Sequence, residues 1–164
     1  MIIDVPKISE QGSEFEGEEP ADILGLEGDP LVRVETPLRY HLTVERISEG
    51  LLVRGRVEAG FSFACSRCGA FFSTNVEESC FLRDVPLQSD QIEVDVTDDL
   101  REAVLLRIPT APLCGSDCAG VCPHCGVNRN QSSCQCRPPP LNDVWSVLDE
   151  LAPGGKENES SSSK

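Results

Sequence analysis

Eight of the nine cysteines of this chain fall into close pairs, and this pattern constrains the fold more than any other feature of the sequence. The pairs are Cys65/Cys68, Cys114/Cys118, Cys122/Cys125 and Cys134/Cys136, while Cys80 stands alone. Two thiolates this close in sequence can reach one ion from a single turn, so four such pairs make two tetrahedral sites. All eight paired cysteines are therefore candidate metal ligands.

The choice of metal follows from the compartment that we expect. The longest apolar run covers only residues 103–106, so we expect neither a membrane-spanning helix nor a secretory signal, and a cytoplasmic location. Thiol buffers keep disulfides reduced there, which favours metal or redox chemistry over a disulfide framework. Thiolates select zinc or an iron–sulfur cluster. We favour zinc, with one or two ions, because paired knuckles of this kind close a fold, and the cluster is the alternative.

How the four pairs combine is left open by the sequence, since three combinations exist. The six distal cysteines exceed the needs of one site, so a second site must recruit the first pair. We prefer Cys122 and Cys125 with Cys134 and Cys136, and Cys65 and Cys68 with Cys114 and Cys118. The long loop that this requires is acceptable because closure entropy grows slowly with loop length. A single occupied site with spare thiols is the other hypothesis.

The segment 114–137 has almost no aliphatic side chains, so something other than hydrophobic burial must order it. Apparent binding free energies of about 10–16 kcal/mol for zinc in finger peptides are large enough to do so. A site with four thiolates has no open position for a catalytic water. We therefore expect the ions to fold the chain and not to catalyse a reaction.

Alternating apolar and polar residues predict a largely antiparallel sheet in the centre of the chain. The alternation covers residues 38–45, resumes after a turn at 48–50 over 51–65, and returns over 72–82 and 92–96. The second arm leads directly into the first cysteine pair. Cys80 falls on the apolar side of the third stretch, so we expect a buried, inert thiol there.

A helical period follows, from Thr97 until Pro109 ends it, with Asp98 and Asp99 as expected cap residues. The predicted fold class is α+β: a mainly antiparallel sheet with one middle helix, a cysteine-rich zinc-binding loop module and a short C-terminal helix. The expected parts are an acidic, partly ordered N-terminal segment at 1–30, the sheet and helix at 31–110, the zinc-binding module at 111–140, an amphipathic helix anchored by Trp145 at 141–152, and a disordered tail at 153–164.

The net charge of −14 is unevenly distributed. Residues 1–30 hold nine acids and one lysine, whereas residues 31–83 hold seven arginines and six acids. We do not expect a chain this acidic to coat nucleic acid, because a protein needs a basic face to neutralise the phosphates. A local contact of the arginines with ribosomal RNA stays open, beside the simpler interpretation that they pair with acids on the strands. The acidic flanks equally suit a basic ribosomal protein as partner.

Catalytic groups are hard to find in this sequence. His41 alternates outward on its strand, and His124 lies inside a knuckle, either as an exposed side chain or as a replacement ligand. A redox Cys-x-x-Cys opens a helix, whereas Cys65 follows a strand. We expect a protein that is not an enzyme and takes no small-molecule substrate. A zinc/thiol redox sensor or thiol oxidoreductase is the alternative, and an acidic adaptor held together by its cysteines is a third hypothesis.

Several stretches resemble the bacterial YceD family in its cysteine-rich form. They are Cys-Ser-Arg-Cys at 65–68, Val-Asp-Val-Thr-Asp-Asp-Leu-Arg-Glu-Ala-Val-Leu-Leu at 94–106, Pro-Leu-Cys-Gly-Ser-Asp-Cys-Ala-Gly-Val-Cys-Pro-His-Cys-Gly-Val-Asn at 112–128, and Cys-Gln-Cys at 134–136. Cys80 and Arg129 depart from the family pattern. The family is associated with accumulation of the large-subunit ribosomal RNA. The resemblance therefore implies a non-enzymatic factor in large-subunit biogenesis.

Overall fold

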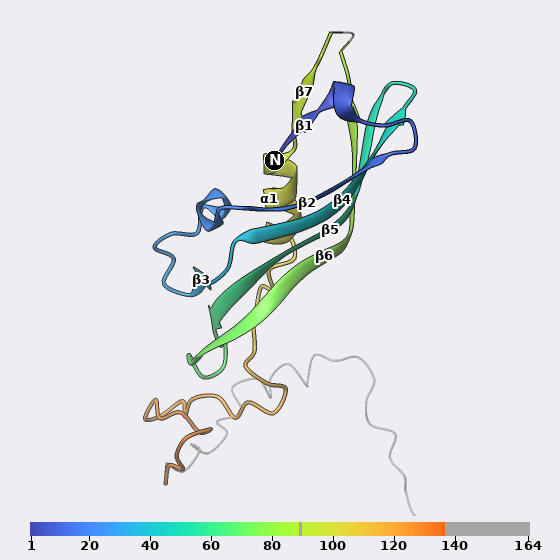
Figure 1. Ribbon diagram of the computed structural model, residues 1–164. Helices are drawn as coiled ribbons and strands as arrows, with labels where there is room; N and C mark the ends of the chain where they lie inside the picture. Colours follow the sequence, from blue (N-terminus) through green and yellow to red (C-terminus); the bar gives the residue numbers. More distant parts are fainter. Residues whose placement is uncertain (89, 137–164) are drawn as a thin grey trace, which may run out of the picture.

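The computed structural model describes residues 1–88 and 90–136. The helix expected at 141–152, with Trp145, and the tail expected at 153–164 lie outside the described residues. The centre of the fold is an antiparallel meander of three long strands, β4 (Leu38–Ile47), β5 (Gly50–Ala64) and β6 (Phe71–Pro86) (Figure 1). The pairing of Ile47 with Gly50 closes the first hairpin around the turn that the sequence predicted.

Strand β5 organises the sheet because it pairs along both of its edges. Strand β6 follows one edge, while the other edge pairs with β4 over its first half and with β3 (Val32–Val34) over its second half. Pro37 cannot donate a backbone hydrogen bond, and the pairing is interrupted there. The Thr36 hydroxyl oxygen instead accepts the Gly60 N–H at 2.8 Å. Strand β2 (Ser13–Glu19) extends the sheet beyond β4.

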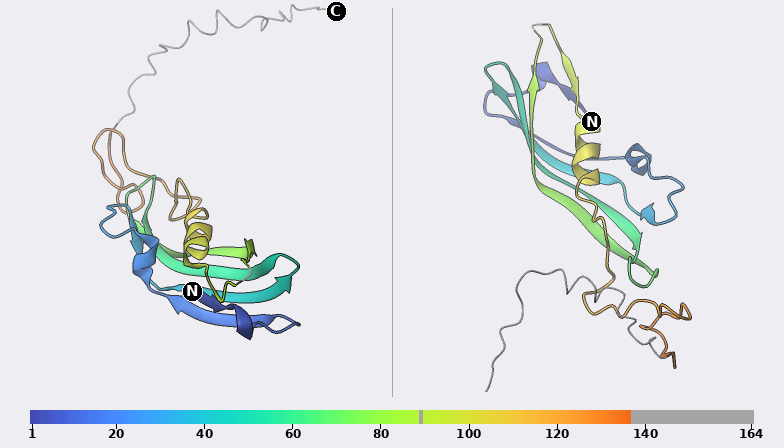
Figure 2. Two further views of the ribbon diagram at one scale, coloured as in Figure 1. Left: turned by 90° about the horizontal axis from the view of Figure 1, so that it is seen from above. Right: turned by 180° about the vertical axis from the view of Figure 1, so that it is seen from behind.

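The remaining elements cover one face and one end of this sheet. Strands β1 (Ile2–Asp4) and β7 (Glu93–Asp95) form a small antiparallel pair, and the short 3₁₀ helices are η1 (Val5–Lys7) and η2 (Ala21–Leu24). Helix α1 (Thr97–Leu105) lies across one face of the sheet, while the cysteine-rich loops gather at the end where β5 turns into β6 (Figure 2). None of the helices in the described ranges is long and apolar enough to cross a membrane.

The core lies between α1 and the sheet face that the alternation of β5 predicts. The inward side chains of β5 are all buried: Leu51, Val53, Val57, Ala59, Phe61 and Phe63. The rings of Phe61 and Phe63 stack with centroids 5.4 Å apart. Leu100 and Val104 of α1 are fully buried against this layer. The predicted fold class, a mainly antiparallel sheet with one α-helix and cysteine clusters able to hold metal, is confirmed for the described residues.

The expectation that Cys80 is buried is wrong. Strand β6 pairs Glu78 with Val57 and Phe81 with Gly55, so two residues of β6 oppose one residue of β5. This β-bulge shifts the alternation by one position, since successive side chains of a strand point to opposite faces. Phe81 is therefore buried, while Cys80 is exposed and Leu82 is 64% exposed.

The middle helix begins at Thr97 as predicted, but its capping and its end differ from the sequence interpretation. Neither Asp98 nor Asp99 caps α1 through its side chain. The Thr97 N–H donates instead to the Asp95 carboxylate at 2.9 Å, and Asp99 forms an ion pair with Arg83 at 2.5 Å. The helix ends at Leu105, several residues before Pro109. Upstream of it, Ile92 was expected on the buried side of its strand but is 65% exposed, outside β7.

Candidate metal centres

The first cysteine group joins the β5–β6 turn to the loop that follows α1. It contains Cys65, Cys68, Cys114 and Cys118, whose sulfur atoms all lie within 4.8 Å of one another. Cys65 follows the last residue of β5 directly, and the pair 65/68 forms a tight knuckle. In it, the Gly69 N–H donates to the Cys65 carbonyl at 2.8 Å and the Cys65 N–H donates to the Ala70 carbonyl at 2.9 Å.

The second cysteine group repeats this construction within the loop itself. It contains Cys122, Cys125, Cys134 and Cys136, again with all sulfur atoms within 4.8 Å of one another. The Gly126 N–H donates to the Cys122 carbonyl at 2.9 Å, and the Cys122 N–H donates to the Val127 carbonyl at 2.8 Å. Gly69 and Gly126 both have φ of +72°, a conformation that glycine adopts without strain. The shared Cys-x-x-Cys-Gly sequence therefore gives the same turn twice.

The loop after α1 is held against the first knuckle by backbone contacts. The Ser66 N–H donates to the Pro112 carbonyl at 2.8 Å, and the Val121 N–H donates to the Arg67 carbonyl at 3.0 Å. The Arg67 guanidinium donates to the carbonyls of Ser116 and Cys118, each at 3.3 Å. Arg67 thus holds the segment that carries Cys114 and Cys118 against the first knuckle. The sequence analysis did not predict this role.

Burial differs between the two groups. Cys65, Cys68 and Cys118 are buried and pack with Ala70 and Phe72, so the first group sits in a small apolar cluster at the end of the sheet. In the second group only Cys122 is buried, while Cys125 and Cys136 are exposed. The first group is therefore the more shielded from water.

Backbone amides favour the thiolate form at Cys65 and Cys118 of the first group and at Cys122 of the second. The Cys114 N–H donates to the Cys65 sulfur at 3.4 Å, and this bond, with others from residues 67 and 68, lowers the pKa of Cys65 to about 6. The amides of Cys125 and His124 lower the pKa of Cys122 to about 6 in the same way. Thiolates are the form that binds metal, so each group begins with a ligand that ionises readily.

Cys114 in the first group and Cys136 in the second resist ionisation because of their neighbours. The pKa of Cys114 is raised to about 12, first by its hydrogen bond with Cys118 and then by that with Cys65. The pKa of Cys136 is raised to about 12, first by its hydrogen bond with Cys125. Negative charges collected at one point disfavour further ionisation. A divalent cation among the sulfur atoms would reverse this effect.

The sulfur spacing also fits a four-coordinate ion. A tetrahedral ion with metal–sulfur bonds of about 2.3 Å places its ligands about 3.8 Å apart, whereas a disulfide needs about 2.05 Å. The Cys65 and Cys118 sulfur atoms are 3.8 Å apart, and those of Cys68 and Cys114 are 3.7 Å apart. The two groups can therefore hold metal ions, and the donor set suits zinc or iron.

The eight candidate ligands are brought together in the combination that we preferred from the sequence. Among the described residues, no histidine belongs to either group. His124 is exposed, and its backbone N–H is directed at Cys122. Cys80 lies on the outer face of β6 and is likewise in neither group.

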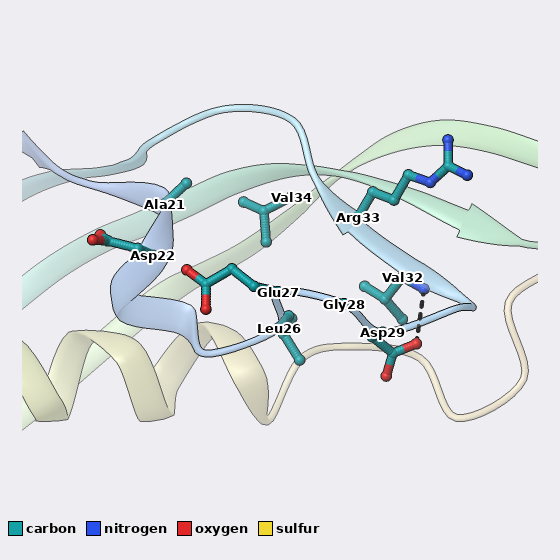
Figure 3. A pocket seen from close by; sticks show the side chains of 9 residues that line it. All are labelled: Ala21, Asp22, Leu26, Glu27, Gly28, Asp29, Val32, Arg33 and Val34. Atoms are coloured by element: carbon teal, nitrogen blue, oxygen red, sulfur yellow. Dashed lines mark hydrogen bonds between the residues drawn. The ribbon is translucent and has the colours of Figure 1, made fainter.

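A separate hollow of about 440 Å³ lies between η2 and β3 (Figure 3). Its charged side chains are Asp22, Glu27, Asp29 and Arg33. Asp29 is occupied in the turn, since its carboxylate accepts the Leu31 N–H at 2.7 Å and the Val32 N–H at 3.1 Å. Arg33 extends away and stacks over the Phe71 ring at 4.3 Å. Asp29 thus shapes the turn before β3, and among the described residues the acids of this hollow form no group that could hold a metal ion, unlike the cysteines.

Comparison with known proteins supports the expected resemblance. Residues 82–152 match the family model described as large ribosomal RNA subunit accumulation protein YceD. This range contains the final part of β6, α1 and six of the eight candidate ligands. The resemblance to the YceD family is thus confirmed over this stretch.

Curated relatives match longer stretches of the chain. An uncharacterized protein of Mycobacterium tuberculosis is 29% identical over 144 residues, which cover 77% of this chain and 70% of that protein. One of Mycobacterium leprae is 32% identical, covering 64% of this chain and 54% of that protein. The large ribosomal RNA subunit accumulation protein YCED homolog 1 of Arabidopsis thaliana, a chloroplastic protein, is 22% identical, covering 62% of this chain and 44% of its own length. No solved structure matches this chain.

Proposed function

We propose that this protein is a non-enzymatic, cytoplasmic zinc-binding factor that supports accumulation of large-subunit ribosomal RNA and so ribosome biogenesis. The match of residues 82–152 to a family named for that accumulation carries the proposal. The name of the chloroplastic relative supports it. The two groups of four cysteines support a structural metal role, because four thiolates complete a tetrahedral ion and leave no position for a substrate.

Zinc would order the module that the factor uses. In the described part of segment 114–136, the buried residues are Cys118, Gly120 and Cys122, and no aliphatic side chain is among them. Hydrophobic burial therefore contributes little there, and metal–thiolate bonds would supply the missing free energy of folding. All eight grouped cysteines are the proposed ligands: Cys65, Cys68, Cys114, Cys118, Cys122, Cys125, Cys134 and Cys136.

The sheet face opposite α1 is a candidate contact surface. Its side chains include the arginines Arg39, Arg54 and Arg56, and the glutamates Glu14, Glu16, Glu18, Glu45, Glu58 and Glu77. Arg54 pairs with Glu45 at 2.5 Å, and Arg39 approaches Glu18 at 3.9 Å. Arginines held beside carboxylates are poorly placed to neutralise phosphates. This face therefore favours a basic ribosomal protein over direct contact with ribosomal RNA.

Affinity capture of the tagged protein separates these partners. We expect ribosomal proteins to be recovered equally with and without ribonuclease treatment of the lysate. Crosslinks from the protein directly to ribosomal RNA, lost when Arg39 and Arg56 are replaced by glutamine, would instead assign the face to RNA.

The biogenesis role is tested by depletion and complementation. Depletion of the protein in its native cells should lower large-subunit ribosomal RNA relative to small-subunit RNA, and the wild-type gene should restore it. A variant with Cys65→Ser and Cys68→Ser should fail to restore it, whereas Cys80→Ser should succeed because Cys80 lies outside both groups. Normal large-subunit RNA after complete depletion would reject the proposal.

A zinc/thiol redox sensor or thiol oxidoreductase is the second candidate, favoured by the exposure of Cys125 and Cys136 in the second group. Peroxide would oxidise two thiolates of the second group to one disulfide. The peroxide would be reduced to water, and the ion would be released. Mild peroxide should then release one zinc ion, and a thiol reductant should allow it to rebind. Zinc that stays bound under these conditions would exclude this function.

A further inference from the structure

Asn130 lies at the junction of the two cysteine groups. It belongs to the loop between Cys125 and Cys134 of the second group, yet its side-chain amide donates to the sulfur of Cys118 in the first group at 3.3 Å. The same amide nitrogen donates to the Asn128 side-chain oxygen at 2.9 Å, and the Asn130 side-chain oxygen accepts the Ala119 N–H at 2.8 Å.

These contacts fix which way the Asn130 amide points. A backbone N–H can only donate, so the atom facing Ala119 must be the oxygen. The nitrogen, with two hydrogens, then faces Cys118 and Asn128, and both of its donors are used. Asn130 therefore presents a hydrogen-bond donor to the sulfur of Cys118, as outer residues that orient a metal ligand do.

The position of Asn130 depends on the fold of the second loop. The Asn130 N–H donates to the Asn128 side-chain oxygen at 3.0 Å, and the Arg129 N–H donates to the Gly120 carbonyl at 2.9 Å. An isolated bridge joins Asn128 to Val121, next to the ligand Cys122. An ion in the second group would hold both ends of this loop and so hold Asn130 against Cys118.

We infer that Asn130 is a positioning residue that couples the two metal centres: occupation of the second centre strengthens binding at the first through the hydrogen bond to Cys118. The inference rests on the proposed metal binding. Coupling of binding free energies is reciprocal, so an ion in the first centre also strengthens binding at the second. The more exposed second centre would thereby regulate the more shielded first centre, although the two centres share no ligand.

The test uses the full-length protein loaded with zinc and titrated with a competing chelator, which resolves the two dissociation steps. Loss of an outer contact to a ligand typically weakens metal binding about 10–100-fold, so Asn130→Ala should weaken the first centre by about tenfold or more. Asn130→Asp, which cannot donate to sulfur, should weaken it at least as much. Ser133→Ala, in the same loop, should leave both steps unchanged. Cobalt substitution gives a second readout, since the sulfur-to-cobalt absorption of the first centre should shift in Asn130→Ala.

A double-mutant comparison tests the coupling itself. Cys125→Ser with Cys136→Ser disables the second centre and should weaken the first by a similar factor. Adding Asn130→Ala to that variant should then change the first centre little, because the hydrogen bond is already lost. Unchanged first-centre affinity in Asn130→Ala, or fully additive losses, would overturn the inference. Absence of bound metal in the wild-type protein would instead reject the proposed metal role itself.

Discussion

Gly55 lies where β5 faces the bulge of β6, and its backbone leaves no room for a side chain. Its φ is +154°, and an added Cβ would collide with the His41 carbonyl oxygen and come within 2.9 Å of the Leu42 Cα. These neighbours belong to the backbone of β4 and cannot rotate away. Gly55→Ala should therefore lower the free energy of unfolding by about 3 kcal/mol, measured by urea denaturation.

Gly28→Ala is the matched control for this change. Gly28 has φ of +83° but no atom within 4 Å of an added Cβ, so only backbone strain remains. Its loss should be about 1 kcal/mol. Equal losses in the two variants would mean that the close packing of β4 against Gly55 does not matter.

Glu78 joins the bulge to the end of the helical segment. Its carboxylate accepts the Arg107 guanidinium at 2.5 Å and the Cys80 N–H at 2.8 Å, and these bonds hold its pKa below the ordinary value of 4.5. A lowered pKa stabilises the fold above the unfolded-state value and loses that effect as pH falls through the folded-state value. The stability advantage of wild type over Glu78→Gln should thus be present at pH 7 and shrink below about pH 4.5, in urea titrations. A constant difference across that range would contradict this, and Glu77→Gln is the exposed control.

Single residues also mark the limit of what the sequence predicts. The two Cys-x-x-Cys-Gly sequences predict the two knuckles, because this turn depends only on the local cysteine spacing and on the following glycine. The exposure of Cys80 could not be predicted, since a bulge is a property of two paired strands and not of one. Asn130 is similarly invisible: its partner sulfur belongs to a different cysteine group, and only the folded loop brings the two together.

At the scale of elements, α1 is held to β6 by charge and to the sheet by burial, and the two contributions differ greatly. Arg83 pairs with Asp99 at 2.5 Å and with Glu102 at 3.3 Å, at an exposed edge. Exposed pairs contribute about 0–1 kcal/mol, so Arg83→Gln should cost less than about 1 kcal/mol. Leu100 is fully buried, and Leu100→Ala should cost about 3 kcal/mol. Measured by thermal denaturation, high salt should reduce the stability loss of Arg83→Gln and leave that of Leu100→Ala unchanged. A larger loss for Arg83→Gln than for Leu100→Ala would refute this ranking.

The elements with one buried face were the most predictable. In β4 and β5 the inward positions are consistently apolar, so alternation alone predicted both strands and their hairpin. Strand β2 was not predicted, because Glu14, Glu16 and Glu18 obscure a short pattern in an acidic segment. Its pairing with β4 depends on residues far away: Phe15 lies opposite Leu42, and the Tyr40 side chain fills the space above Gly17.

At the scale of the whole molecule, the described residues contain two buried clusters of different composition, and Phe72 packs against both. The large one is aliphatic and aromatic and unites the sheet, α1 and β1. The small one consists of Cys65, Cys68 and Cys118 with Ala70 and Phe72 against them. Composition alone indicated this division, since residues 114–137 hold six of the paired cysteines and almost no aliphatic side chains. The docking of the module on the first knuckle required long-range contacts, such as Ser66 with Pro112, that no local pattern encodes.

This division predicts a selective response to metal removal. Complete chelation should abolish the dispersed amide signals of residues 114–136 and perturb the turn at 65–70, because the module contacts the sheet through that turn. The strand signal in circular dichroism and the amides of β4 should persist, since the large cluster contains no proposed ligand. Addition of zinc should restore the lost signals. Unfolding of the sheet together with the module would contradict this expectation and would mean that the two clusters form one cooperative unit. Dispersed amide signals of residues 114–136 without metal would also contradict it, because contacts other than metal–thiolate bonds would then order the module.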